Sequence, residues 1–224
     1  MIKKKKSGHL IVISGPSGSG KGTIVSKLLE KENRWLSIST TSRKIRSNDK
    51  EGITYNFVSR EEFEDKIKEG YFLEYTEYAG NYYGTPKEKI KEKLEEGNDV
   101  FLEIEIEGAS NIKKIVPEAI FIFIMPPSLK ELILRLKGRK TDSISAIIKR
   151  FKVAYKEINE VTKYNYVVVN DDLEKAVSKV ESIIEAEECR VDRIEDIYLD
   201  NPEELIHEFL VEKEVDNKNV SEKI

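Results

Sequence analysis

A short apolar run followed at once by a glycine-rich loop constrains the fold of this chain more than any other feature. Leu10–Ser14 is apolar and β-branched, which is typical of a buried strand. Residues 15–22 are rich in glycine, and Thr23–Lys31 has apolar residues at helical spacing. A strand, a glycine loop and a helix in this order open a parallel α/β sheet. We therefore expect an α/β fold in which helices flank a parallel sheet.

The loop has the Gly-x-x-x-x-Gly-Lys spacing of a phosphate-binding loop. Its glycines let backbone N–H groups turn toward an anion, and the next helix adds the positive end of its dipole. A flexible turn is the alternative, but the lysine, the strand and the helix all stand where phosphate binding requires them. We predict that the donor nucleotide, ATP, contacts Gly15, Pro16, Ser17, Gly18, Ser19, Gly20, Lys21, Gly22 and Thr23. Gly22 occupies the usual hydroxyl position, so Thr23 is the candidate metal ligand, directly or through water.

Composition and charge exclude several classes of protein. Lys and Arg number 38 against 42 Asp and Glu, a formal net charge of −4, which argues against nucleic-acid binding by charge alone. Cys189 is the single cysteine, so no disulfide can form within the chain. No apolar stretch approaches the roughly 18–20 residues of a membrane span. The lysines at 3–6 precede too short an apolar run for an export signal, so we expect a solvated lysine arm and a cytoplasmic protein.

The middle third of the chain differs in pattern from the rest. Residues 37–60 suggest short antiparallel strands, and a helix, a strand, a turn and a second helix are expected at Glu61–Glu69, Tyr71–Tyr78, Gly80–Gly84 and Pro86–Glu96. Parallel-sheet alternation then returns. Strands are expected at Val100–Ile106, Ala119–Met125 and Tyr166–Val169, with helices at 109–115, Leu129–Arg135, Ile144–Val161 and Leu173–Glu188. We predict a core of residues 1–37 and 91–190, a mixed α+β insertion at 38–90, a short helical lid at about 136–152, and an appended tail at 191–224.

The chain resembles guanylate kinase from about Leu10 to Glu188, with the matching motifs in unbroken order. The segments that carry the resemblance are Ser39–Arg46, Gly52–Phe57, Phe72–Tyr75, Gly80–Thr85, Leu102–Gly108, Pro126–Ser128, Arg135–Arg139 and Val169–Asp172. Gly80-Asn-Tyr-Tyr-Gly84 is among the more specific of them. The resemblance implies a P-loop NTPase-type core, a GMP-binding insertion and a lid.

The resemblance also implies an acceptor site. Residues on the family positions that hold the GMP phosphate are Ser39, Arg43, Arg46, Tyr55 and Tyr83. Glu74 falls on the carboxylate that accepts from guanine N1–H and the 2-amino group, and Thr85 on the hydroxyl near O6. One carboxylate can take two adjacent donors, and adenine offers no matching pair. For each residue alone, an ordinary surface position is the alternative.

Acidic residues alternate along the next expected strand. Glu103, Glu105 and Glu107 would share one face of a strand, and a solvated edge is the plain explanation. In the family, acidic residues matching Glu103 and Glu105 serve guanine and the water shell of magnesium. Glu107 departs from the family, which usually has glutamine there, and its role stays open.

The lid completes the implied machinery. Arg135, Arg139 and Arg150 match family arginines that close over the phosphates, where phosphoryl transfer needs charge stabilisation. With Lys21 and Arg43 they form the predicted catalytic set, and Asn170 matches a position near adenine. Lys140 and Ile144–Ser145 depart from the family pattern in the lid.

The implied reaction is Mg²⁺-dependent transfer of phosphate from ATP to GMP, and also to dGMP. The partners are small nucleotides, with no nucleic acid and no membrane, and the protein is a monomer or a homodimer. One alternative is a non-catalytic interaction module, but such domains typically have a degraded phosphate loop. Another is a kinase with a different phosphorylated acceptor, against which Glu74 and Thr85 argue.

Overall fold

The computed structural model describes residues 3–4, 7–137 and 144–196. The chain divides into two compact units, Lys6–Glu185 and a smaller one made of Met1–Lys5 with Ala186–Ile224. Arg139, Lys140 and part of the predicted lid lie outside the described residues. So do residues 197–224, which make up most of the predicted appended tail.

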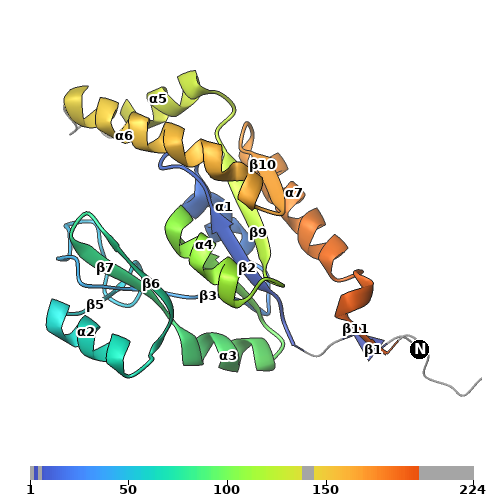
Figure 1. The fold of residues 1–224 in the computed structure, drawn as a ribbon. Coiled ribbons are helices and arrows are strands. Elements are labelled where there is room, and N and C mark those ends of the chain that lie inside the picture. The colour runs from blue at the N-terminus through green and yellow to red at the C-terminus, as the bar shows by residue number, and fades with distance from the viewer. Residues whose placement is uncertain (1–2, 5–6, 138–143, 197–224) are drawn as a thin grey trace, which may run out of the picture. The chain divides into compact units, whose positions relative to one another are not determined.

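A five-stranded sheet forms the centre of the larger unit (Figure 1). Its order is β10 (Tyr166–Val169), β9 (Ile120–Met125), β2 (Leu10–Ser14), β8 (Asp99–Glu103) and β3 (Arg34–Leu36). All four pairings are parallel. The prediction of a parallel α/β fold is therefore confirmed, and the carboxyl ends of these strands share one edge of the sheet.

Helices cover both faces of this sheet, which is why β2 is buried throughout. Ile11 and Ile13 pack with α1 (Lys21–Leu28) and α7 (Leu173–Glu187). Leu10 and Val12 pack on the other face with α3 (Lys87–Glu95) and α4 (Ile106–Ile115). Successive side chains of a strand point to opposite faces, so a strand between two helical layers is buried at every position.

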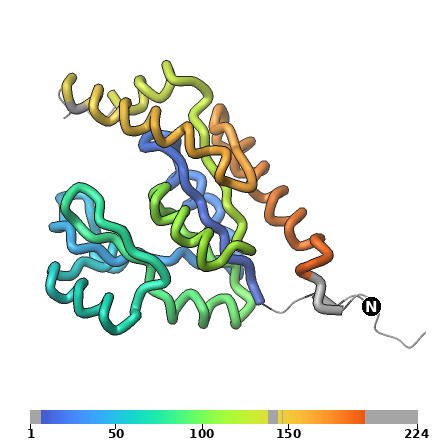
Figure 2. The backbone as a smooth tube through the Cα atoms, in the orientation of Figure 1, coloured from blue at the N-terminus to red at the C-terminus, as the bar shows by residue number. Residues whose placement is uncertain are grey.

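A second sheet of four strands is built from the residues between β3 and α3. Its order is β5 (Asn56–Phe57), β4 (Thr40–Thr41), β7 (Asn81–Pro86) and β6 (Phe72–Tyr78), and α2 (Arg60–Lys68) precedes β6. Ser59 caps α2 by accepting from the Glu62 backbone N–H. The tube in Figure 2 follows the chain out of the parallel sheet after β3 and back to it through α3 and β8.

Two expectations for this region were wrong. β4 and β5 pair in parallel, whereas the sequence suggested antiparallel strands, and the antiparallel partner of β4 is β7. Gly80-Asn-Tyr-Tyr-Gly84 was expected to be a turn, but only Ala79 and Gly80 turn, with positive φ angles of 50° and 78°. The remaining residues of the motif are strand, because β7 bonds to β6 on one side and to β4 on the other.

After β9 the described chain continues into helices that precede β10. These are α5 (Leu129–Lys137) and α6 (Ile144–Ile158), which continues into the 3₁₀ turn η1 (Asn159–Lys163). Leu132 and Leu136 of α5 pack against Ala154 of α6 in a small apolar cluster of their own. No helix among the described residues is both long and apolar enough to cross a membrane.

The smaller unit contains a two-stranded antiparallel sheet of β1 (Lys3–Lys4) and β11 (Ile194–Asp196), preceded by the turn η2 (Val191–Arg193). Arg193 pairs with Glu187 at 2.7 Å. Lys3 and Lys4 were expected in a solvated arm, but their backbone pairs in this strand.

Candidate functional site

The glycine loop joins β2 to α1 at the carboxyl edge of the parallel sheet. Gly15 has φ of +145°, and a Cβ there would lie 2.3 Å from the carbonyl oxygen of Ile124 in β9. Gly20 has φ of +91°, and its Cβ would lie 2.4 Å from Asn170 Nδ2. Only glycine combines these backbone angles with such close neighbours. The strand, loop and helix predicted from the sequence are therefore present in the expected order.

Lys21 is the first residue of α1. Its Nζ donates to the carbonyl oxygens of Gly15 at 2.6 Å and Pro16 at 3.3 Å. The ammonium is thus held over the loop by backbone acceptors. Thr23 is exposed in the same first turn of the helix.

Asn170 and Arg135 brace the loop. Asn170, which follows β10, is buried and donates from Nδ2 to the Ser19 carbonyl at 2.8 Å. Arg135 donates to the Asn170 carbonyl at 3.1 Å and to the Ser19 carbonyl at 3.4 Å, while Glu131 accepts from its Nε at 2.9 Å. The two residues were predicted as nucleotide ligands, and here they contact the backbone of the loop.

Arg150 reaches the same loop from α6. Its Nη2 lies 3.1 Å from Ser17 Oγ, within hydrogen-bond distance. Arg135 and Arg150 therefore approach the loop from two different helices. Arg139 lies outside the described residues.

Glu74 is the most constrained carboxylate of the second sheet. Its side chain is 6% exposed, and Thr85 Oγ1 donates to its Oε1 at 2.7 Å. Oε2 is buried and has no hydrogen-bond partner among the described residues. A Cβ on Gly108 would lie 3.2 Å from Oε2, so a glycine in α4 leaves room for it. Burial raises the pKa of Glu74, the Thr85 hydroxyl partly offsets this, and the charge of Glu107 raises the pKa further.

Arg43 is held between a carboxylate and two aromatic rings. Its Nη1 lies 2.9 Å from Asp49 Oδ2, and the guanidinium lies 5.4 Å from the Tyr55 ring centre and 5.6 Å from that of Phe57. The hydrogen bond that Arg43 donates to Asp49 raises the pKa of Arg43 and lowers the pKa of Asp49. Sequence reasoning missed Asp49, because a carboxylate in a polar loop has no signal that separates it from ordinary surface.

The acceptor phosphate was also expected to contact Tyr55, Tyr83, Ser39 and Arg46. The rings of Tyr55 and Tyr83 lie 5.8 Å apart edge to face, and burial raises the pKa of Tyr55 to about 12. Ser39 is half-buried just before β4, and Arg46 is exposed, with its backbone N–H on Asp49 Oδ2 at 2.7 Å. The structure thus brings the rings of Tyr55 and Tyr83 and the guanidinium of Arg43 close together beside the second sheet.

Three glutamates that were expected on one strand face are divided between two elements. β8 ends at Glu103, Glu105 is the residue before α4, and Glu107 lies in the first turn of that helix. The expected strand through residue 106 and the alternation argument were therefore wrong. Glu103 is an exposed residue, yet desolvation of its carboxylate raises its pKa, an effect that the charge of Lys21 partly offsets.

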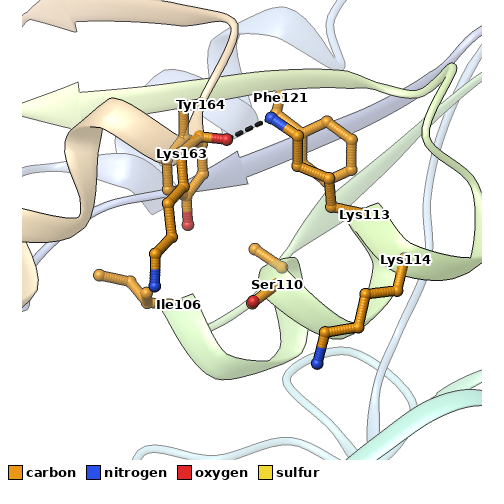
Figure 3. A pocket seen from close by; sticks show the side chains of 8 residues that line it. Ile106, Ser110, Lys113, Lys114, Phe121, Lys163 and Tyr164 are labelled. Carbon is orange, nitrogen blue, oxygen red and sulfur yellow. Dashed lines mark hydrogen bonds between the residues drawn. The ribbon is translucent and has the colours of Figure 1, made fainter.

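A pocket of about 280 Å³ lies elsewhere on the larger unit, between α4, β9 and η1 (Figure 3). Among its lining residues are Ser110, Lys113, Lys114, Phe121 and Tyr164. Lys113 donates to the Lys163 carbonyl and lies 5.2 Å from the Phe121 ring centre. None of the predicted site residues lines this pocket.

The parallel sheet, with a phosphate loop at its carboxyl edge and arginines facing that loop, defines a P-loop nucleotide-binding protein of the α/β class. Comparisons with known proteins agree. The family model described as guanylate kinase matches residues 7–187. The chain belongs to the guanylate kinase family.

Individual relatives cover nearly the whole chain. A guanylate kinase of Clostridium tetani is 56% identical over 205 residues, which is 92% of this chain and 99% of the relative. One of Caldanaerobacter subterraneus subsp. tengcongensis is 56% identical over 203 residues, 90% of this chain and 98% of the relative. The crystal structure of guanylate kinase from Anaplasma phagocytophilum is 34% identical, with a TM-score of 0.72 over 87% of this chain and 93% of that one.

Proposed function

We propose that this protein transfers the γ-phosphate of ATP to GMP, with ADP and GDP as products. Membership of the guanylate kinase family and an undamaged phosphate loop support the kinase reaction. The choice of acceptor rests on Glu74. In this proposal residues 38–90 form the GMP-binding subdomain and residues 136–152 the lid.

The unpartnered oxygen of Glu74 is the observation that carries the choice of guanine. Leaving a buried acceptor unsatisfied costs about 1–3 kcal/mol, so such atoms are rare unless a ligand completes them. Guanine presents N1–H and the 2-amino group side by side, and both can donate to one carboxylate. Adenine has no such pair of donors and would leave Glu74 unsatisfied. Thr85 fixes the carboxylate and lies near the position of guanine O6.

The phosphate of GMP is proposed to lie against the group around Arg43. The residues concerned are Ser39, Arg43, Arg46, Tyr55 and Tyr83. An arginine fork can make two charge-assisted hydrogen bonds to one phosphate. Asp49 holds Arg43 in a defined rotamer, so less side-chain entropy is lost when phosphate binds.

The donor end uses the loop and its facing arginines. Backbone N–H groups of residues 15–22 and the dipole of α1 would hold the phosphates of ATP, with Lys21 on the terminal ones. Arg135, Arg139 and Arg150 would then neutralise charge on the moving phosphoryl group as the lid excludes water. Asn170, whose side chain donates to the Ser19 carbonyl of the loop, is proposed to lie near the adenine of ATP.

The residues near Lys21 fit a magnesium ion carried by the nucleotide. The described residues contain no cluster of three or more His, Cys, Asp or Glu that would form a cage for an ion. Mg²⁺ bound with a nucleotide keeps several waters and takes few protein ligands, so a cage is not required. Thr23 and Glu103 supply the oxygen donors that Mg²⁺ prefers, and the ion would neutralise phosphate charge. The use of dGMP, a cytoplasmic location and the oligomeric state stay predictions.

A coupled assay of ADP release tests this function. The protein receives ATP and Mg²⁺ with GMP, AMP, CMP or UMP in turn, beside Glu74→Ala and the matched control Glu77→Ala. Glu77 lies on the same strand but is exposed. We expect turnover with GMP far above the others, lost in Glu74→Ala and kept in Glu77→Ala. No turnover with any monophosphate, in protein that still binds ATP, would favour an interaction module or another acceptor.

A further inference from the structure

Glu157 of α6 has no role in the proposal above, yet its environment is unusual. The side chain is half-buried, and Oε2 is shut off from solvent with no hydrogen-bond partner among the described residues. Burial raises the pKa of Glu157. Sequence reasoning had no signal for it, because a glutamate near the end of an amphipathic helix resembles any solvated one.

The groups that act on Glu157 place it at the nucleotide site. The Ser17 backbone N–H and the Lys21 ammonium lower its pKa, whereas the charge of Glu105 raises it. Glu157 in turn helps to raise the pKa of Tyr78 at the end of β6 and of Tyr164. These electrostatic interactions couple the Glu157 carboxylate to groups of the phosphate loop, to Glu105 just before α4 and to Tyr78 at the end of β6.

The packing of α6 fixes the face of the helix on which Glu157 lies. Arg150 and Glu157 are seven residues apart, about two helical turns, so they lie on the same face of α6. Arg150 reaches Ser17 Oγ from that face at 3.1 Å. Ala154 between them is fully buried against Leu132 and Leu136. The position of Glu157 follows from this packing.

The chemistry of an ionised carboxylate limits what it can bind. A carboxylate only accepts hydrogen bonds, so phosphate oxygens cannot be its partner. Lys21, whose charge lowers the pKa of Glu157, already donates to the Gly15 and Pro16 carbonyls. The open oxygen lacks a hydrogen-bond donor, and a buried acceptor without a partner is typical of a functional site.

We infer that Glu157 is a further substrate-facing residue, whose open oxygen accepts an O–H donor that the bound nucleotides bring. The donor is either a ribose hydroxyl or a water that travels with magnesium. This inference rests on the proposed function, because both concern the same nucleotide site. It makes α6 a contributor to substrate binding on both sides of Ala154, through Arg150 and through Glu157.

The test compares Glu157→Ala, Glu157→Gln and the control Glu185→Ala, an exposed glutamate of α7. We expect kcat/KM of Glu157→Ala to fall about tenfold or more, as loss of a hydrogen bond to a charged group implies. Glu157→Gln keeps an acceptor oxygen and should be intermediate. The Tm of Glu157→Ala should equal or exceed that of the parent, because in the free protein the desolvation of the carboxylate outweighs its favourable interactions with Lys21 and the Ser17 N–H.

Calorimetry separates the two sources of the donor without measuring activity. If it is the ribose 2′-hydroxyl, the parent binds GMP more tightly than dGMP, and Glu157→Ala loses the difference. If it is the magnesium water, Glu157→Ala needs more Mg²⁺ for the same affinity for ADP. Affinities and kcat/KM of Glu157→Ala within twofold of the parent would overturn the inference, as would a loss of activity matched by a lower Tm. An inactive parent would instead count against the proposed function.

Discussion

Thr85 donates its hydroxyl hydrogen to one oxygen of Glu74 and leaves the other oxygen buried without a partner. The two residues are opposite each other on the paired strands β6 and β7. Because the hydroxyl fixes the carboxylate, the open oxygen has a defined direction. The proposed selectivity for guanine depends on this pair, and the first two predictions follow from it.

The first prediction concerns pH. Glu74 accepts from two N–H groups only when it is ionised, and its pKa lies above the ordinary value of 4.5. The KM for GMP should therefore begin to rise, as pH falls, at a higher pH than an ordinary glutamate would cause. Steady-state kinetics in Glu74→Gln should lack this rise.

The same raised pKa affects the stability of the free protein. The contribution of Glu74 to stability is fully present below the pKa that it has in the unfolded chain, and it is lost as pH rises through the higher pKa of the folded state.

The second prediction concerns Glu107, where the family usually has glutamine. Its negative charge raises the pKa of Glu74. Glu107→Gln should therefore move the onset of the KM rise to lower pH and leave kcat at neutral pH unchanged. The same pH series measures it, with Glu88→Gln, an exposed glutamate of α3, as the control. An unmoved onset would show that Glu107 does not act on Glu74.

The third prediction concerns Gly15. An alanine Cβ at Gly15 would lie 2.3 Å from the Ile124 carbonyl oxygen, in addition to the strain of positive φ. At Gly70, φ is +68° but a Cβ would meet nothing within 4 Å. Gly70→Ala should lose about 1–2 kcal/mol of stability from φ alone. Gly15→Ala should lose more and should also lose ATP binding. Thermal unfolding and ADP calorimetry measure the two effects, and equal losses of stability would refute the close approach of loop and β9.

The fourth prediction concerns Asp49. Its carboxylate accepts from Arg43 and from the Arg46 backbone, so it orients the segment proposed to bind the GMP phosphate. Asp49→Ala should raise the KM for GMP by about three- to tenfold and change the KM for ATP little. Asp65→Ala, an exposed residue of α2, is the control. Initial rates at varied GMP and ATP give both constants. A KM for GMP that does not change would remove Asp49 from the site.

Features that depend on neighbouring residues were predictable from the sequence. Leu10–Ser14, the glycine loop and the helix after it were expected in this order and are present. The α/β class follows from them, because an apolar strand that leads into a phosphate loop lies in a sheet with helices on both of its faces. The order of motifs also identified the family. Glu74 and Thr85 could be paired only through the resemblance.

Features that depend on contacts between distant segments were settled by the tertiary structure alone. The parallel pairing of β4 with β5 was not predictable, because strands of two residues have no periodicity that fixes their direction. Glu105 and Glu107 alternate like strand residues, but α4 begins between them, where its Ala109 and Ile112 pack under the sheet. Asp49 and Glu157 resemble solvated acids until folding brings them to Arg43 and Ser17. Sequence therefore determined the local elements and the phosphate loop, whereas tertiary packing decided which charged groups are desolvated, since desolvation depends on neighbours far along the chain.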